Sequence, residues 1–256
     1  MRTQHGINGG ESAGETVGDL AYSRIRADIL FGRLQPGERL RLDAFSQRYG
    51  ASISTMRELL NRLSSEGLIV AEGQRGFEVA PVSPAEFQEV GALRLLLEVH
   101  AMTQSFAAGD LDWEARVVAA HHKLSVLESR MIEQSDADPV LWKQCDRMFH
   151  QTLISACGSR TLMATHSAVY DKYLRYQMIA VIFRGEAAAR EHAELLDCAL
   201  KRDPDRAGAI LQRHIESCVS YALSKEATDW ASDRAGPPRT SEPKRRGTKE
   251  SAGTLA

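Results

Sequence analysis

Residues 50–79 constrain the fold of this 256-residue chain most strongly, because a helical apolar pattern is followed at once by two short apolar segments. The apolar residues of SISTMRELLNRLSSEG fall on one stripe at helical spacing: Met56, Leu59, Leu60 and Leu63. Gly67 ends this helix, and the segments LIVAEG and GFEVAP then fit a hairpin with the tip GQRG at 73–76. The stretch therefore predicts a helix packed beside a hairpin.

Two further helical patterns precede it between residues 20 and 50. LAYSRIRADILFGRL is ended by the turn QPGERL, and RLDAFSQRYG is a short helix with Gly50 as its C-cap. Three helices and a hairpin in this order are typical of a winged helix-turn-helix, whose recognition helix enters the DNA major groove N-terminus first. We therefore predict a DNA-binding domain over residues 19–82.

The first turn of the third helix carries three hydroxyls, on Ser52, Ser54 and Thr55. Hydroxyls and free backbone amides at a helix N-terminus favour phosphate contact. Arg57 lies one turn further on, where it can reach a guanine edge or a phosphate, and Arg75 at the hairpin tip can enter the minor groove or touch the backbone. The alternative is that the serines only cap the helix and that Arg57 pairs with Glu58 or Glu66.

The rest of the chain is helical in pattern from residue 84 to residue 226, without any strand signal. Ser83 before Pro84 is a strong helix start. Further helices are expected at about 112–135, 138–157, 159–183, 186–202 and 204–226. The fold class is thus mainly α, with a winged helix-turn-helix followed by an all-α bundle of six to seven helices over residues 84–226.

Composition limits the location and the redox state of the chain. Residues 1–18 and 227–256 lack apolar periodicity and are expected to be disordered tails, and the basic cluster at 244–246 either contacts DNA phosphates or is simply solvated. The net charge of −2 gives no global attraction to nucleic acid. No signal peptide or membrane span is apparent, so we expect a cytoplasmic, nucleoid-associated protein whose four cysteines are reduced and buried.

Four residues of the bundle have spacings that suit a metal site. Asp146 and His150 stand four apart and share one helix face. His192 lies twelve residues before Pro204 and His214 ten residues after it, so two antiparallel helices would bring both imidazoles to one level. One carboxylate and three imidazoles suit Zn²⁺, Ni²⁺, Mn²⁺ or Fe²⁺. The alternative is that each is a surface or hydrogen-bonded core residue, which is our expectation for the other histidines: His100, His121, His122 and His166.

The N-terminal pattern resembles a known family. The run GASISTMRELLNRLSSEGLIVAEGQRGFEV is similar to the signature of the GntR family of bacterial transcription regulators, with Ile53 at the usual arginine position and Thr55 at the usual proline position. The resemblance implies DNA contacts by Ser52, Ser54, Thr55, Arg57, Arg75 and Gly76. Ile53 either contacts a thymine methyl group or faces the protein core.

The bundle resembles the ligand-binding FCD domain of the FadR-like branch of that family. DRMFH, EHAELLDCALKRDPDRAGAILQRHI and LRLLLE reproduce its pattern, although this chain reads Cys157-Gly158-Ser159-Arg160 where relatives often have Ser-Gly-Asn. The resemblance implies a divalent metal on Asp146, His150, His192 and His214 that helps to hold a small carboxylate. Arg94 is the candidate partner of that anion, or else pairs with Glu98 at the rim, and Arg175 is a second candidate.

These observations predict a homodimeric regulator that binds a palindromic operator, acts as a repressor and responds to a small organic acid. Two other readings stay open. The first is a metal-dependent hydrolase or lyase that uses the Asp/His site. It is disfavoured by the attached DNA-binding domain and by the lack of a nearby general base. The second is a constitutive DNA-binding protein with a structural metal.

Overall fold

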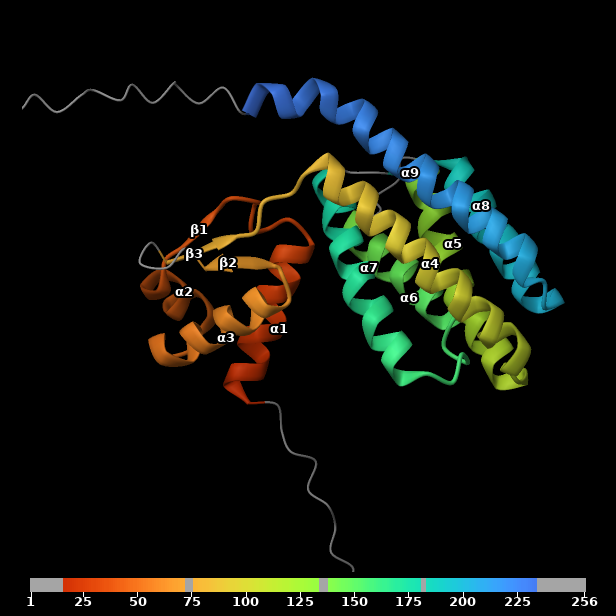
Figure 1. The fold of residues 1–256 in the computed structure, drawn as a ribbon, viewed down its shortest axis with the longest axis horizontal. Coiled ribbons are helices and arrows are strands. Elements are labelled where there is room, and N and C mark those ends of the chain that lie inside the picture. The colour runs from red at the N-terminus through yellow and green to blue at the C-terminus, as the bar shows by residue number, and fades with distance from the viewer. Residues whose placement is uncertain (1–15, 72–75, 134–137, 181–182, 234–256) are drawn as a thin grey trace, which may run out of the picture.

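A computed structural model describes residues 16–71, 76–133, 138–180 and 183–233, with the side chains of the last helix described as far as residue 224. The described chain forms an N-terminal domain of helices and a small sheet beside a larger helical bundle (Figure 1). Each domain has its own cluster of buried apolar side chains. The mainly α fold with a winged helix-turn-helix is therefore confirmed. Among the described residues, no helix is long and apolar enough to cross a membrane.

The N-terminal domain has the predicted helices and hairpin and one additional strand. Its elements are α1 (Val17–Leu30), β1 (Arg39–Leu40), α2 (Leu42–Tyr49), α3 (Ile53–Ser65), β2 (Ile69–Ala71) and β3 (Phe77–Val79). The sheet is antiparallel in the order β1-β3-β2, with Leu40 opposite Phe77 and Ile69 opposite Val79. The sequence analysis missed β1, because two residues are too few to show an alternating pattern.

The ends of α2 and α3 follow the cap residues. Gly50 adopts the left-handed conformation at φ 70° after α2, as predicted for a C-cap. Ser52 is the N-cap of α3, and its side chain accepts a hydrogen bond from the Thr55 amide. The Ser54 and Thr55 hydroxyls in turn lie 2.8 and 2.9 Å from Ser52 Oγ. These contacts cap the first turn of α3, whose N-terminal residues 52–54 are exposed to solvent.

The described bundle contains six helices. They are α4 (Pro84–Ala108), α5 (Leu111–Ile132), α6 (Pro139–Leu153), α7 (Arg160–Ala180), α8 (Glu186–Lys201) and α9 (Pro204–Asp233). All six correspond to predicted helices, but α6 ends earlier than the expected residue 157. Helix α9 continues to Asp233, past the predicted start of the tail at residue 227.

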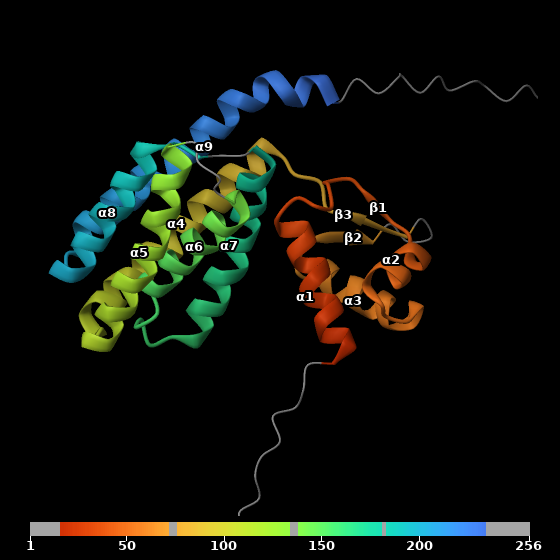
Figure 2. The same ribbon diagram turned by 180° about the vertical axis from the view of Figure 1, so that it is seen from behind.

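The packing of the bundle brings α6, α8 and α9 around a common centre. Helix α5 packs against α6 and α8, and α9 packs against α4 and α8 (Figures 1 and 2). Asp138 and Pro139 start α6, and Pro204 starts α9 after the turn at Arg202, which has a left-handed backbone. Helix α7 is the bundle helix that packs against α1 of the N-terminal domain.

Candidate metal centre and nucleic-acid interface

The four predicted metal ligands converge in the bundle core. Asp146 and His150 come from α6, His192 from α8 and His214 from α9, and all four are buried. One ligand atom from each lies within 4.8 Å of every other. Asp146 Oδ1 lies 3.2 Å from His192 Nε2 and 3.7 Å from His150 Nε2. The spacing argument from the sequence therefore identified four side chains that the fold does bring together.

Three glutamates lie behind the histidines and orient them. The Nδ1 atoms of His150, His192 and His214 lie 2.5, 2.6 and 2.8 Å from carboxylate oxygens of Glu98, Glu128 and Glu191, respectively. A carboxylate only accepts hydrogen bonds, so the Nδ1 atoms of His150 and His192 carry a proton and their Nε2 atoms face away from the glutamates. His214 Nδ1 lies beside Arg184 Nη2 at 3.0 Å as well as beside Glu191. This carboxylate–histidine arrangement is the usual support of metal-binding imidazoles.

Unsatisfied atoms at the centre fit a metal ion. The Nε2 atoms of His150 and His192 are buried and have no hydrogen-bond partner in the described structure. The Asp146 carboxylate is bound on its other oxygen by the Tyr170 hydroxyl at 2.9 Å and the Lys143 ammonium at 3.3 Å, so Oδ1 is the oxygen that faces the histidines. A buried donor set that lacks partners is costly unless a cation completes it.

Burial and neighbouring charges set the protonation states of the four candidate ligands. Burial lowers the pKa of His150 and brings that of His214 well below its usual value, which keeps both rings neutral. Burial also opposes protonation of His192, but Asp146 and Glu128 outweigh it and raise its pKa to about 9. Burial alone would raise the pKa of Asp146, whereas Lys143 and the histidines hold it well below the ordinary value. Asp146 is therefore ionised at neutral pH.

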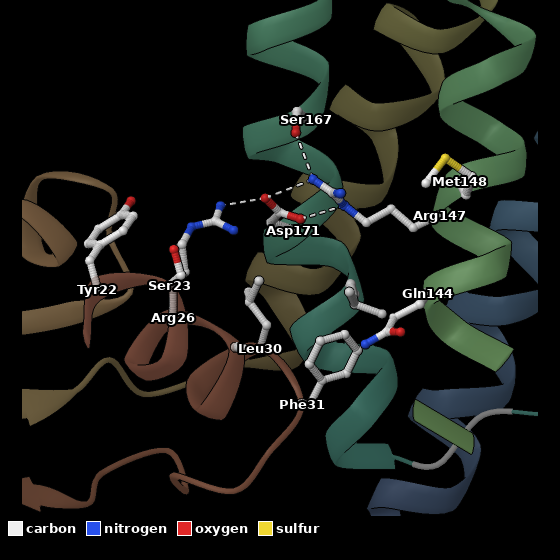
Figure 3. Close-up of a pocket in the computed structure, with 12 residues that line it drawn as sticks. Tyr22, Ser23, Arg26, Leu30, Phe31, Gln144, Arg147, Met148, Ser167 and Asp171 are labelled. Carbon is white, nitrogen blue, oxygen red and sulfur yellow. Dashed lines mark hydrogen bonds and ion pairs between the residues drawn. The ribbon is translucent and has the colours of Figure 1, made fainter. Parts of the chain in front are cut away.

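A small cavity adjoins the donor set. It has room for about one water molecule, roughly 10 Å³. It is lined by Trp142, Lys143, Asp146, Gln177, Arg184, Ala188, His192, His214 and Cys218. Two polar atoms in its wall, Trp142 Nε1 and Gln177 Oε1, are buried without a partner. A larger cleft of about 660 Å³ lies elsewhere, between α1 and the bundle helices α6 and α7 (Figure 3), and shares none of these residues.

Arg94, predicted to face an anionic effector, is fully buried beside this centre. Its Nε donates to Glu98 at 2.9 Å, and its guanidinium lies over the rings of Tyr170 and Tyr173. The alternative pairing with Glu98 thus exists, but in the core and not at the rim. Arg94 does not line the small cavity, while both its terminal nitrogens are buried without hydrogen-bond partners.

Arg175 lies in a different place. Its guanidinium donates to the carbonyl of Ala80, in the segment between the two domains, and it does not line the cavity beside the metal donors. His166 is a hydrogen-bonded core residue, one of the two outcomes expected for it, because it is fully buried and hydrogen-bonded to Glu98. The sequence analysis assigned none of the three glutamates to the support of the histidines, and it did not single out Lys143 or Arg184. A charged residue within an apolar helix face, such as Glu98 in LRLLLEV, was the available signal.

The predicted DNA-contacting residues form the exposed N-terminal end of α3. Ser52, Ser54 and Arg57 are exposed and Thr55 is partly buried. Arg57 forms no ion pair with any described residue, and Glu66 is instead bound by Arg26 and Tyr22. The Ser52 hydroxyl caps the helix, as in the alternative reading, but its neighbours remain accessible to a phosphate.

Ile53 is half exposed and does not pack in the core, so only the thymine-contact reading of this residue stays open. Gly76 has a backbone φ of 93°, which disfavours any other residue at the base of the wing. Arg75 and the wing tip at 72–75 lie outside the described residues.

Comparison with known proteins gives a match for the DNA-binding domain and for the helical bundle. The FCD domain model matches residues 89–217, and the model of bacterial regulatory proteins of the gntR family matches residues 19–79. The chain is 39% identical over 208 residues to the uncharacterised HTH-type transcriptional regulator BphR of Paraburkholderia xenovorans (strain LB400), covering 79% of this chain and 83% of that relative. The chain belongs to the GntR family. It is a transcriptional regulator that joins a GntR DNA-binding domain to an FCD effector-binding domain.

Other members of the family extend the comparison. This GntR regulator is 29% identical to the HTH-type transcriptional repressor GlaR of Escherichia coli (strain K12), over 76% of this chain and 90% of the relative. The fold matches that of E. coli McbR/YncC with a TM-score of 0.69 at 18% identity, covering 82% of this chain and 99% of the other. A GntR regulator from Rhodococcus sp. RHA1 gives a TM-score of 0.66 at 22% identity, covering 79% and 95%. These structural matches concern the fold alone.

Proposed function

We propose that this GntR regulator is a repressor whose DNA binding responds to a small organic acid held at a divalent metal in the FCD domain. The observation that carries the proposal is the buried set of Asp146, His150, His192 and His214, with two imidazole nitrogens that lack partners. Three imidazoles and one carboxylate suit Zn²⁺, Ni²⁺, Mn²⁺ or Fe²⁺ and leave positions for an oxygen donor. A bound ion would polarise and anchor a carboxylate there.

The side chains around the cavity support a carboxylate as the effector. Lys143 and Arg184 are the cations in its wall, and Trp142 Nε1 is a buried donor without a partner. Cations and N–H donors beside a metal favour an anionic oxygen ligand. Arg94 remains a second candidate, because its two unpartnered nitrogens are buried behind Glu98. Since the cavity holds only about one water, effector binding must move these side chains.

Homodimer formation is part of the proposal. Helix-turn-helix regulators read palindromic operators as dimers. On the bundle surface, α4 exposes Leu93 and Leu96, the latter at 68%, and clefts lined by apolar α4 residues run along its contact with α9. Exposed apolar surface of this kind is expected where two copies meet. Repression is supported by the relatives named as repressors, among them GlaR and NanR of Cronobacter sakazakii.

The test begins with selection of an operator from a random DNA library, because the operator is not known. Binding of the selected DNA is then measured with a panel of mono- and dicarboxylates, using protein loaded with Zn²⁺ and protein stripped by a chelator. We expect at least one acid to lower DNA affinity by about 5- to 150-fold, and only with the metal-loaded protein. A panel without any effect on DNA binding would favour the constitutive DNA-binding protein.

A matched pair of variants separates the effector site from its surroundings. Lys143→Met removes a cation of the cavity wall, whereas Lys201→Met removes an exposed lysine at the end of α8. The first is expected to abolish the acid response while DNA binding persists, and the second to leave both unchanged. An undiminished response in Lys143→Met would contradict the assigned cavity. Turnover of an acid without operator binding would favour the metal-dependent enzyme.

A further inference from the structure

One carboxylate joins the metal-bearing bundle to the DNA-binding domain. Asp171 on α7 is almost fully buried, and Figure 3 shows an arginine reaching it from each side. Arg26 of α1 places Nη2 2.5 Å from Oδ2, and Arg147 of α6 places Nε 2.8 Å from Oδ1. Asp171 therefore contacts the DNA-binding domain through Oδ2 and helix α6 of its own bundle through Oδ1.

On the bundle side, the bridge begins at the metal donors. Arg147 lies on α6 between Asp146 and His150, the two ligands that this helix supplies. Its Nη2 also donates to Ser167 on α7 at 2.8 Å, so the guanidinium is held at two points of α7. Any shift or rotation of α6 that accompanies a change at its two ligands must therefore alter the contact between Arg147 and Asp171.

On the DNA side, the bridge ends at the recognition helix. Arg26 uses its Nε to bind Glu66 at 3.0 Å, and Glu66 is the C-cap of α3. The Tyr22 hydroxyl donates to the same carboxylate, and Arg62 of α3 lies 3.8 Å from the centre of the Tyr22 ring. Helices α1 and α3 are thus tied together, and a force applied to Arg26 acts on both.

Open space lies on both sides of the bridge. Clefts of about 660 and 470 Å³ flank it, and both are lined by Arg26 and Asp171. Few packed atoms therefore resist a change in the domain angle at this point. Burial would lower the pKa of Arg26, but Asp171 and Glu66 more than compensate and raise it, so the guanidinium stays charged.

We propose that Asp171 couples the metal centre to the recognition helix, with the state of α6 setting, through Arg147, how Asp171 holds Arg26. This inference rests on the proposed metal site. It assigns a regulatory role to three side chains that touch neither DNA nor the metal donors directly. Coupling of this kind requires an element with two arrangements that both sites favour differently. Here that element is the pair of guanidinium contacts on one carboxylate.

Hydrogen–deuterium exchange with Zn²⁺ as the probe tests the coupling without operator or effector. Full-length protein is stripped with a chelator and compared with and without added Zn²⁺. In the wild type we expect slower exchange in α6, α8 and α9, and a change of about fivefold or more in α1 and the C-terminal end of α3. In Asp171→Asn and in Arg26→Gln, the first response should persist and the second should disappear.

Asp197→Asn is the matched control. Asp197 pairs with Lys201 and Arg206 at the surface of the bundle, so this variant should keep both responses. A wild type without a Zn²⁺ response in α6, α8 and α9 would overturn the metal site itself. Two results would overturn the coupling alone. One is a wild-type response in α6, α8 and α9 without any change in α1 and α3. The other is a change in α1 and α3 that is as large in both bridge variants as in the wild type. Loss of the α6 response in both variants would also overturn it, because Asp171 would then support the metal site directly.

Discussion

His192 Nδ1 lies 2.6 Å from Glu128 Oε1, and this contact joins α8 to α5 behind the metal donors. The carboxylate accepts the proton of Nδ1 in a hydrogen bond and so turns Nε2 towards Asp146 Oδ1, 3.2 Å away. Glu98 makes the same contact with Nδ1 of His150, and Glu191 with Nδ1 of His214. The capacity of this site to hold a metal therefore depends on residues that do not touch it.

Replacement of Glu128 by Gln tests this dependence. The amide keeps the shape of the side chain but removes the charge that supports His192, so we expect Zn²⁺ affinity to fall by roughly 10- to 100-fold. A competition titration against a chromophoric chelator measures the change. Glu186→Gln, at an exposed glutamate at the start of α8, is the control and should bind Zn²⁺ like the wild type. Equal affinities in the two variants would contradict the supporting role of Glu128.

Metal uptake is predicted to release about one proton at pH 7. His192 has a pKa raised to about 9 and is protonated there, whereas the lowered pKa values of His150 and His214 leave those rings neutral. Zn²⁺ can bind His192 Nε2 only after that proton leaves, so apparent affinity should fall as the pH is lowered from 9. Calorimetry in buffers of different ionisation enthalpy counts the protons. A release near zero at pH 7 would show that His192 is already neutral.

Arg57→Ala should weaken binding to a selected operator by about 1–3 kcal/mol, because Arg57 is an exposed cation on the first turns of α3. Fluorescence anisotropy at fixed ionic strength measures the loss, and metal content should not change. Arg190→Ala removes an exposed arginine of the bundle and is the matched control. If the two variants bind the operator equally well, Arg57 does not contact DNA.

Ile53→Ser probes the residue that departs from the family pattern. Since Ile53 is 50% exposed, the free energy of unfolding should change by less than about 0.5 kcal/mol. The selected DNA sequences should lose a preference for thymine at one position of each half-site, because the apolar contact to the methyl group is gone. Unfolding curves and a repeated operator selection check both parts. An unchanged base preference would remove Ile53 from the DNA interface.

Local patterns were sufficient for the helices and for grouping the four side chains of the candidate metal site. Asp146 and His150 share a helix face, and His192 and His214 flank one proline turn, so spacing alone related them in pairs. The supporting carboxylates are different, because Glu98 and Glu128 lie 52 and 64 residues from the histidines they orient. Contacts over such separations depend on how the helices pack, which a single sequence does not reveal.

The sequence also did not reveal which face of a helix packs against which neighbour. Arg175 was predicted to line the cavity, but its face of α7 points towards the segment between the domains, where it binds Ala80. The pattern of α7 does not distinguish the face towards the bundle core from the face towards the DNA-binding domain. For the same reason, the bridge from Arg26 through Asp171 to Arg147 had no signal in the sequence.

The metal content of the purified protein tests the central claim most directly. Elemental analysis combined with native mass spectrometry should find one divalent transition-metal ion per chain in the wild type. His150→Ala and His192→Ala should lose most of it, whereas His100→Ala, which removes an exposed histidine of the same domain, should retain it. Equal metal content in all three variants, or a metal-free wild type that takes up no added Zn²⁺, would contradict the account.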